Sequence, residues 1–116
     1  MTITTRQHKG KQIIYSDNTG LSSEKCIEHL EQMTKLILDA PGKVRLLTNF
    51  KDAAVGPEFM SRAKELGVKT LPKTERQAIL GIDGLKMMLL KAYVKFTGAD
   101  IKICQTEAEA LDYLAS

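Results

Sequence analysis

The chain has 116 residues and a formal net charge of +3, and 43% of its residues are hydrophobic. These values are typical of one soluble globular domain, here residues 1–116, which is long enough to bury a core without disulfides or a structural metal. Aromatic residues make up only 5% of the chain and Trp is absent. A stacking surface for single-stranded bases is therefore not expected, and we predict no nucleic-acid partner.

The two cysteines, Cys26 and Cys104, are isolated from each other and have no matching histidine spacing. This pattern argues against a zinc site and favours a reducing compartment. The polar amino-terminal sequence MTITTRQHKGK lacks the apolar run of a signal peptide. No apolar run approaches the roughly 20 residues that cross a membrane. We therefore expect a cytoplasmic protein with no metal, no cofactor and no integral membrane segment.

Strand and helix signals alternate through the first half of the chain. Two short strands flank the sequence His8-Lys9-Gly10-Lys11, which predicts a hairpin that turns at Gly10. Ser22 or Ser23 then provides a helix cap. The predicted elements are strands at residues 3–7 and 12–16, a helix from 22–23 to Pro41-Gly42, a strand at 43–49, and a helix that begins at Pro57 and ends at Gly67.

The second half continues the alternation. Thr106 and Glu109 have the spacing of a capping box, in which each side chain binds a free amide of the first helical turn. The predicted elements are a loop at 68–76, a strand at 77–80, a helix from Gly84 to about Thr97, a strand at 101–104, and a last helix buried through Ala108, Leu111 and Leu114. The order ββαβαβαβα predicts an α/β fold with a mixed five-stranded sheet, four helices and largely parallel later strands.

The element order and three stretches of sequence also carry a family resemblance. The stretches are GKQIIYSDNTGL at residues 10–21, VRLLTNF at 44–50, and the long segment from AILGIDGLK at 78 to the end of the chain. They resemble the STAS domain, and more specifically a small bacterial SpoIIAA-like (STAS/Sec14-like) family of largely unassigned function. The resemblance implies a STAS-like fold, docking on partner proteins as the usual mode of action, and nucleotide or lipid binding in some relatives.

One departure from the STAS pattern limits what the resemblance implies. STAS antagonists carry Asp-x-Ser-x-x-Gly where the third strand meets the second helix. The corresponding segment here is LTNFKDA, at residues 47–53, with no acceptor Ser and no Gly in register. The phosphorylation switch is therefore not carried over to this chain. Thr48 is interpreted as a strand-end threonine bonded to the backbone.

Catalytic patterns are weak in this sequence. His8 falls in the hairpin turn, and His29 falls on the polar side of the first helix, where we expect it to be solvated. No Ser or Cys nucleophile stands in a suggestive context, and no pair of carboxylates stands out. We therefore predict that the protein is not an enzyme.

Polar residues end two of the predicted strands and form a possible ligand edge. Asp17 and Thr19 belong to the loop SDNTG after the second strand, Thr48 and Asn49 end the third, and Asp83 follows the fourth. Open parallel sheets bind ligands at this edge. An Asx-type turn formed by Asp17 and Asn18 is the competing interpretation.

The sequence Gly81-Ile82-Asp83-Gly84 joins a predicted strand to a predicted helix. Nucleic-acid clamps of the form GXXG carry basic residues inside the loop, and phosphate loops carry more glycine and a lysine before Ser or Thr. Asp83 fits neither pattern. We predict a tight turn in which the Asp83 carboxylate caps the following helix.

The helix after Gly84 is apolar on two faces. At 100° per residue, one stripe forms the predicted core face and consists of Leu85, Met88, Leu89, Ala92 and Phe96. The opposite stripe consists of Met87, Leu90 and Val94, with Lys86 and Lys91 on the flanks and Lys95 beside Lys91. That second stripe is either covered by another part of the chain, or it binds a protein partner or a second copy, or it faces lipid.

The sequence thus leads to two function hypotheses. The first is a non-catalytic interaction module that docks on a protein partner, or on itself as a homodimer, through the Met87-Leu90-Val94 face with Lys86 and Lys91. The alternative is a carrier of a small ligand or lipid that uses the strand-end edge of Asp17, Thr19, Thr48, Asn49 and Asp83.

Overall fold

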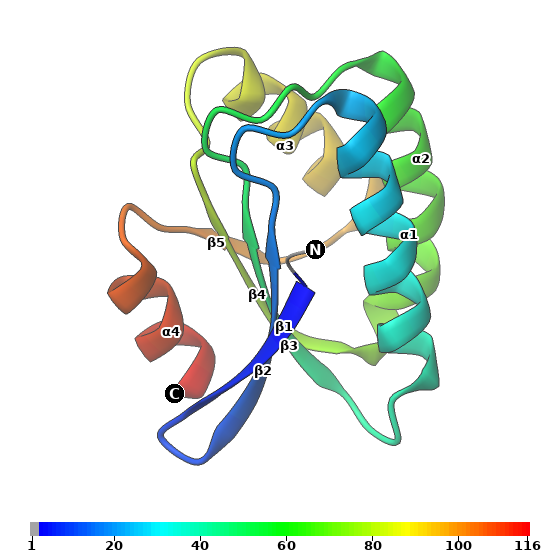
Figure 1. The fold of residues 1–116 in the computed structure, drawn as a ribbon. Helices are drawn as coiled ribbons and strands as arrows, with labels where there is room; N and C mark the ends of the chain where they lie inside the picture. Colours follow the sequence, from blue (N-terminus) through cyan, green and yellow to red (C-terminus); the bar gives the residue numbers. More distant parts are fainter. Residues whose placement is uncertain (1–2) are drawn as a thin grey trace.

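The computed structural model describes residues 3–116 and contains a five-stranded sheet of order β1-β2-β3-β4-β5 (Figure 1). β1 (Ile3–His8) runs antiparallel to β2 (Lys11–Asp17), and the remaining neighbours are parallel. The other elements are α1 (Ser23–Asp39), β3 (Val44–Asn49), α2 (Pro57–Thr70), a 3₁₀ turn (Leu71–Lys73), β4 (Thr74–Leu80), α3 (Leu85–Thr97), β5 (Ile101–Ile103) and α4 (Glu107–Ala115). The predicted α/β class, element order and mixed sheet are confirmed.

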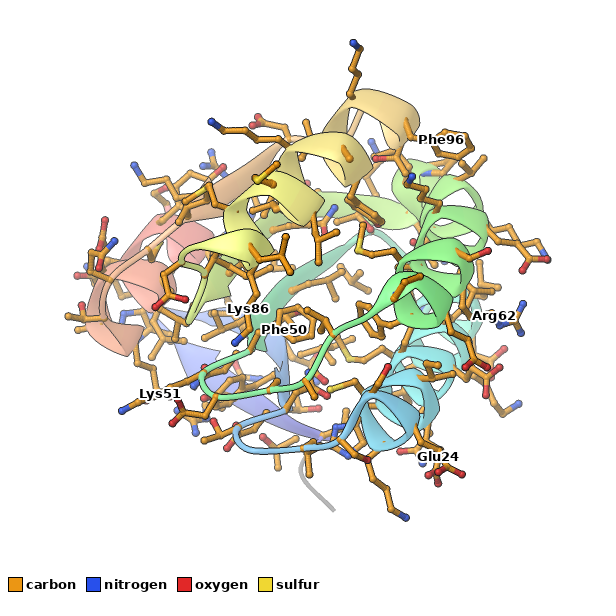
Figure 2. All side chains as sticks on the ribbon, turned by 90° about the horizontal axis from the view of Figure 1, so that it is seen from above. Glu24, Phe50, Lys51, Arg62, Lys86 and Phe96 are labelled. Carbon is orange, nitrogen blue, oxygen red and sulfur yellow. The ribbon has the colours of Figure 1, made fainter. Side chains whose placement is uncertain are left out.

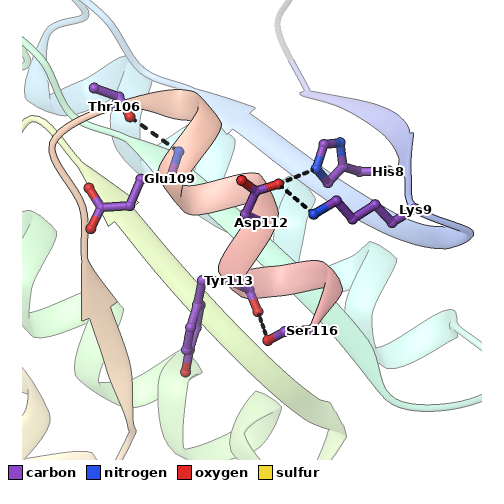
Figure 3. Close-up of polar contacts among 7 residues, drawn as sticks. All are labelled: His8, Lys9, Thr106, Glu109, Asp112, Tyr113 and Ser116. Carbon is purple, nitrogen blue, oxygen red and sulfur yellow. Dashed lines mark hydrogen bonds and ion pairs between the residues drawn. The ribbon is translucent and has the colours of Figure 1, made fainter.

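Turn and cap residues explain why these boundaries fall where they do. Lys9 and Gly10 both have positive φ, of 50° and 80°, as the type I′ turn of a two-residue hairpin requires. Ser22 caps α1 by accepting a hydrogen bond from a first-turn amide at 3.2 Å. Thr106 accepts from the amide of Glu109 at 3.1 Å (Figure 3). Local sequence therefore fixes these ends.

The face of the sheet covered by α4 holds a closed apolar core. Side chains alternate between the two faces along each strand, and every second residue of β2, β3 and β4 points toward α4. Leu47 and Leu114 have no exposed surface at all. The buried members of this core are Ile13, Tyr15, Leu47, Ala78, Leu80, Cys104, Ala110 and Leu114.

Surface ion pairs link α4 to the opening hairpin (Figure 3). One carboxylate oxygen of Asp112 lies 2.8 Å from Nε2 of His8 and 3.2 Å from Nζ of Lys9. These hydrogen bonds and charges lower the pKa of the Asp112 carboxyl. A second pair joins Arg6 to Glu107 at 2.8 Å. α4 is therefore held on the sheet by the apolar core beneath it and, at its rim, by the surface contacts of Asp112 and Glu107 with the hairpin.

The opposite face of the sheet is covered by α1, α2 and α3. α2 packs against both α1 and α3. Buried side chains between α1 and α2 form one cluster around Cys26, Phe59 and Ala63. α1 also packs on β3 through Met33 and Ile37. This layer differs from the α4 side, because α1, α2 and α3 lie closer to one another than to the strands, whereas α4 lies close to β3 and β4.

Two sequence predictions near α2 are wrong. Gly67 does not end the helix, which continues to Thr70, and residues 68–76 form the end of α2, the 3₁₀ turn and the start of β4 instead of a loop. A Cβ at Gly67 would lie 2.2 Å from the hydroxyl oxygen of Tyr93. The glycine therefore permits the close approach of α3. In α4, Ala108 is exposed and Ala110 is buried, which also corrects the predicted face.

No helix within residues 3–116 is long and apolar enough to cross a membrane. In the same part of the chain, no three His, Cys, Asp or Glu residues come together in a way that could hold a metal ion.

Candidate functional site: a cavity between the sheet and three helices

A cavity of about 140 Å³ lies between the sheet and helices α1, α2 and α3. Its walls are mainly apolar and include Leu30, Met33, Phe59, Ala63, Leu90 and Tyr93. The strands contribute the residues that alternate with those of the α4 core, Leu46 and Ile79 among them. A dry apolar cavity of about 150 Å³ is large enough to hold a benzene molecule. This cavity can therefore accept a compact apolar group.

Asn18 supplies an unusual polar group to the cavity wall. The residue is 2% exposed, and its backbone is fixed because its amide donates to the Asn49 carbonyl at 2.8 Å and its carbonyl accepts from Leu21 at 3.0 Å. Its Nδ2 donates to Oγ of Ser16 at 3.3 Å. Its Oδ1 has no hydrogen-bond partner within residues 3–116. An unsatisfied buried acceptor costs about 1–3 kcal/mol, so this atom is a natural contact for a bound molecule.

Lys86 brings a positive charge to the same cavity. It lies in the first turn of α3, and its Nζ donates to the backbone carbonyl of Phe50 at 2.7 Å (Figure 2). No ion pair of Lys86 is found within the described residues 3–116. Burial raises the pKa of the Cys26 thiol, and the charge of Lys86 acts in the opposite direction. The ammonium group therefore influences the interior of the cavity.

The structure separates the residues of the predicted ligand edge. Asp17 and Asn49 are paired neighbours on β2 and β3, one register position beyond Ser16 and Thr48. Because side chains alternate along a strand, Ser16 and Thr48 line the cavity, whereas Asp17 and Asn49 do not. Thr48 is thus the one predicted edge residue in the cavity wall.

The other edge residues have local roles. Oδ1 of Asp17 accepts from the backbone amide of Thr19 at 3.0 Å and from its hydroxyl at 2.6 Å, which is the Asx-type turn considered for this loop. Oδ1 of Asn49 accepts from the amide of Lys51 at 3.0 Å. The predicted cap at Asp83 is wrong. Gly84 occupies the cap position of α3 instead, and a glycine has no side chain that could accept from the first-turn amides.

The two faces of α3 are oriented differently from the prediction. Leu90 is 8% exposed and lines the cavity, and Met87 and Val94 are half-buried. The stripe that the sequence assigns to the core is largely outside. Its exposed fractions are 68% for Leu85, 69% for Met88 and 61% for Phe96, and Ala92 is exposed as well. Leu89 is the member of this stripe that does line the cavity, as predicted.

The reason for this orientation is that the inward face of α3 includes residues with polar ends. Lys86 turns inward to reach the carbonyl of Phe50, and Tyr93 packs over Gly67. Lys91 is exposed on the outer side. A count of apolar residues could not have distinguished the two faces, since both contain large hydrophobic side chains.

His29 and Asn18 are both buried, although the sequence predicted a solvated His29 and did not indicate Asn18 as a cavity residue. His29 is 6% exposed instead of solvated, and its Nδ1 has no partner within the part of the chain that the structure describes. Burial lowers the pKa of this imidazole. The spacing of Cys26, His29 and Met33 along α1 is a helical stripe and could have indicated the burial of His29.

Two ionisable groups at the cavity have pKa values raised by burial. Burial raises the pKa of the Cys26 thiol above its ordinary value, which keeps it protonated near neutral pH. Burial likewise raises the pKa of the Tyr93 hydroxyl. The cavity wall thus offers apolar surface, hydrogen-bonding groups and one cation.

Comparison with known proteins identifies the fold. No protein-family model and no curated protein matches the chain. A solved structure does match: an uncharacterised protein of the DUF3478 family with a SpoIIAA-like fold from Shewanella loihica. The TM-score is 0.67 and the sequence identity 15%, and the match covers 97% of this chain and 92% of the other. The chain has a SpoIIAA-like fold. The resemblance seen in the sequence is therefore confirmed, and the cavity of this SpoIIAA-like fold lies on the face away from α4.

Proposed function

We propose that this protein is a non-catalytic binding protein that holds a small apolar molecule in the cavity between the sheet and α1, α2 and α3. The cavity itself is the observation that carries the proposal. Its wall is mainly apolar, with side chains from the sheet and from all three helices. The proposed location is the cytoplasm, where isolated thiols such as Cys26 and Cys104 stay reduced.

Apolar surface removed from water stabilises a complex by about 25 cal/mol per Å². The wall of this cavity is mainly apolar, so a molecule that fills it without distorting the walls gains this free energy on binding. Ligands without a polar group should therefore bind measurably if they are small enough.

Toluene is a suitable first probe because it is apolar and contains one ring. We expect it to raise the melting temperature of the wild-type chain in a concentration-dependent way. Ala63→Leu should abolish this shift, because Ala63 is buried in the cavity wall and the larger side chain occupies the space. Ala108→Leu, at an exposed position of α4, is the matched control and should keep the shift. A wild-type chain that shows no shift with toluene would contradict the proposal.

A second candidate function is docking of a protein partner on the outer face of α3. Leu85, Met88 and Phe96 are large apolar side chains with more than half of their surface exposed. The helix has no acidic residue, and its exposed lysines include Lys91 and Lys95. Two copies joined symmetrically through this face would bring lysines together, so a partner with an acidic rim fits better than a second copy.

Met88→Asp tests this second candidate, with Leu38→Asp on the exposed side of α1 as the matched control. The expected result is a salt-sensitive complex with a purified acidic protein that is lost in Met88→Asp and kept in Leu38→Asp. Wild-type self-association that only Met88→Asp abolishes would show a second copy as the occupant instead. Binding to anionic vesicles with the same mutant pattern would show a lipid surface.

A further inference from the structure

The groups at one end of the cavity indicate what kind of molecule it binds. Asn18 and Lys86 both line the cavity. Asn18 follows β2 directly and Lys86 lies in the first turn of the helix after β4, so both come from the carboxyl ends of parallel strands. Most of the remaining wall is apolar. The cavity therefore has one polar end and an apolar body.

The hydrogen bonds of the chain hold these two residues near each other. The amide of Asn18 donates to the carbonyl of Asn49, and Nζ of Lys86 donates to the carbonyl of Phe50, the next residue. The same Phe50 carbonyl also accepts from the amide of Ala53 at 3.0 Å. The backbone of Asn18 and the ammonium group of Lys86 are thus held on two consecutive residues at the end of β3, where Figure 2 shows Lys86 beside Phe50.

The charge at this end selects an anion. An ammonium group has three donors, and Lys86 uses one of them for Phe50. It has no acidic partner within residues 3–116. Pairing a partly buried cation with a ligand carboxylate gives a charge-assisted hydrogen bond, which is about twice as strong as a neutral one.

Asn18 can complete the same contact. If its amide turns by 180°, Oδ1 accepts from the hydroxyl of Ser16, and Nδ2 becomes free to donate to a carboxylate oxygen. In the present orientation Nδ2 donates to Ser16 at 3.3 Å and Oδ1 is unpartnered. With a carboxylate bound to Nδ2, the turned amide has partners at both Oδ1 and Nδ2, which removes the cost of the buried acceptor.

We propose that the ligand is a small apolar monocarboxylate whose carboxylate binds Lys86 and Asn18 and whose apolar part fills the cavity. This inference rests on the proposed binding function. The volume of about 140 Å³ restricts the apolar part to about one ring. Benzoate, benzyl alcohol and toluene share that ring and differ in the polar group, so they form a matched set of probes.

Dissociation constants of the three probes, measured by NMR titration at pH 7, test the proposal. Wild-type protein should bind benzoate more tightly than benzyl alcohol or toluene. Lys86→Met removes the charge but keeps an apolar stem, and it should weaken benzoate binding about tenfold or more while leaving toluene binding unchanged. Lys91→Met, at an exposed position of the same helix, is the control and should change neither.

Asn18→Leu provides an independent variant if Lys86→Met does not fold. It replaces the unsatisfied amide with an apolar group and should also weaken benzoate selectively. If toluene binds but benzoate binds no better than benzyl alcohol, or if Lys86→Met leaves benzoate unchanged, the carboxylate assignment is overturned and the cavity function stands. If neither toluene nor benzoate binds, the cavity function itself fails.

Discussion

The two faces of the sheet are built from alternate residues of the same strands, yet they pack in different ways. On one face α4 closes over a core in which Ile13, Leu47 and Leu114 have no exposed surface. On the other face a cavity of about 140 Å³ remains beneath α3. α4 buries alanines, which allow a helix to approach the sheet closely, whereas α1, α2 and α3 pack mainly against one another. Helix placement, more than strand composition, decides which face keeps space for a ligand.

Truncation of one leucine on each face should give the largest effects. Leu114→Ala removes a fully buried side chain from the closed core and should lower the free energy of unfolding by about 2–5 kcal/mol. Leu90→Ala on the cavity side should cost less, nearer to 2 kcal/mol, because part of its surroundings is already open space. Urea unfolding of both variants measures the difference. Equal losses would indicate that the two faces are packed equally well.

The turn that leads into α3 should be the next most sensitive place. Gly81 has φ of 76°, and a Cβ there would lie 2.2 Å from the backbone nitrogen of Lys51. Gly81→Ala should therefore cost more than about 2 kcal/mol. Gly98 has almost the same φ, 78°, with nothing within 4 Å of its added Cβ, so Gly98→Ala should cost about 1 kcal/mol.

Urea unfolding of these two variants isolates the cost of the clash between the added Cβ and Lys51, since both variants carry the same backbone cost. If Gly81→Ala costs no more than Gly98→Ala, the loop before α3 can move away from Lys51 without loss of stability.

Acid should destabilise the α1 side before the α4 rim. Burial lowers the pKa of His29 from 6.5, so the folded state binds a proton less readily than the unfolded state. The contribution of neutral, buried His29 to the free energy of unfolding is then fully present above about pH 6.5 and is lost as the pH drops below that value. The pKa of Asp112 is lowered from 3.8, so its contribution is lost only at more acidic pH.

Urea unfolding between pH 7 and pH 5 measures the contribution of His29. His29→Gln should flatten the dependence in this range, and Asp112→Asn should leave it unchanged. An unaltered slope in His29→Gln would show that another group is responsible.

The smallest effect is expected at the rim of the closed face. Asp112→Asn removes an exposed ion pair with Lys9 and weakens the hydrogen bond to His8, and exposed contacts of this kind contribute little to stability. A slight decrease in melting temperature that disappears in high salt is the expected result. A large decrease would mean that the rim, and not the apolar core, holds α4 on the sheet.

The sequence was sufficient for those features that depend on neighbouring residues. The Lys9-Gly10 turn, the Ser22 cap and the Thr106–Glu109 pair are short-range signals, and each is found in the structure. The alternation of strands and helices followed from them, and the α/β fold was predicted correctly.

Features that depend on distant contacts were not predictable. Gly67 resembles a helix terminator in sequence, and only the position of Tyr93 shows that it permits close packing. The orientation of α3 depends on the inward reach of Lys86. The cavity depends on how α1, α2 and α3 pack together over the sheet. Thr48 was assigned to a ligand edge and does line the cavity, but Asn18 could be recognised only from its burial.

Methyl NMR of the wild-type chain during a toluene titration reports on both faces of the sheet in one experiment. We expect chemical-shift changes at Leu30, Ile79 and Leu90, which line the cavity, and none at Leu47 and Leu114 in the closed core. Changes at Leu47 and Leu114, or none at any of these methyl groups, would contradict the proposed binding in the cavity.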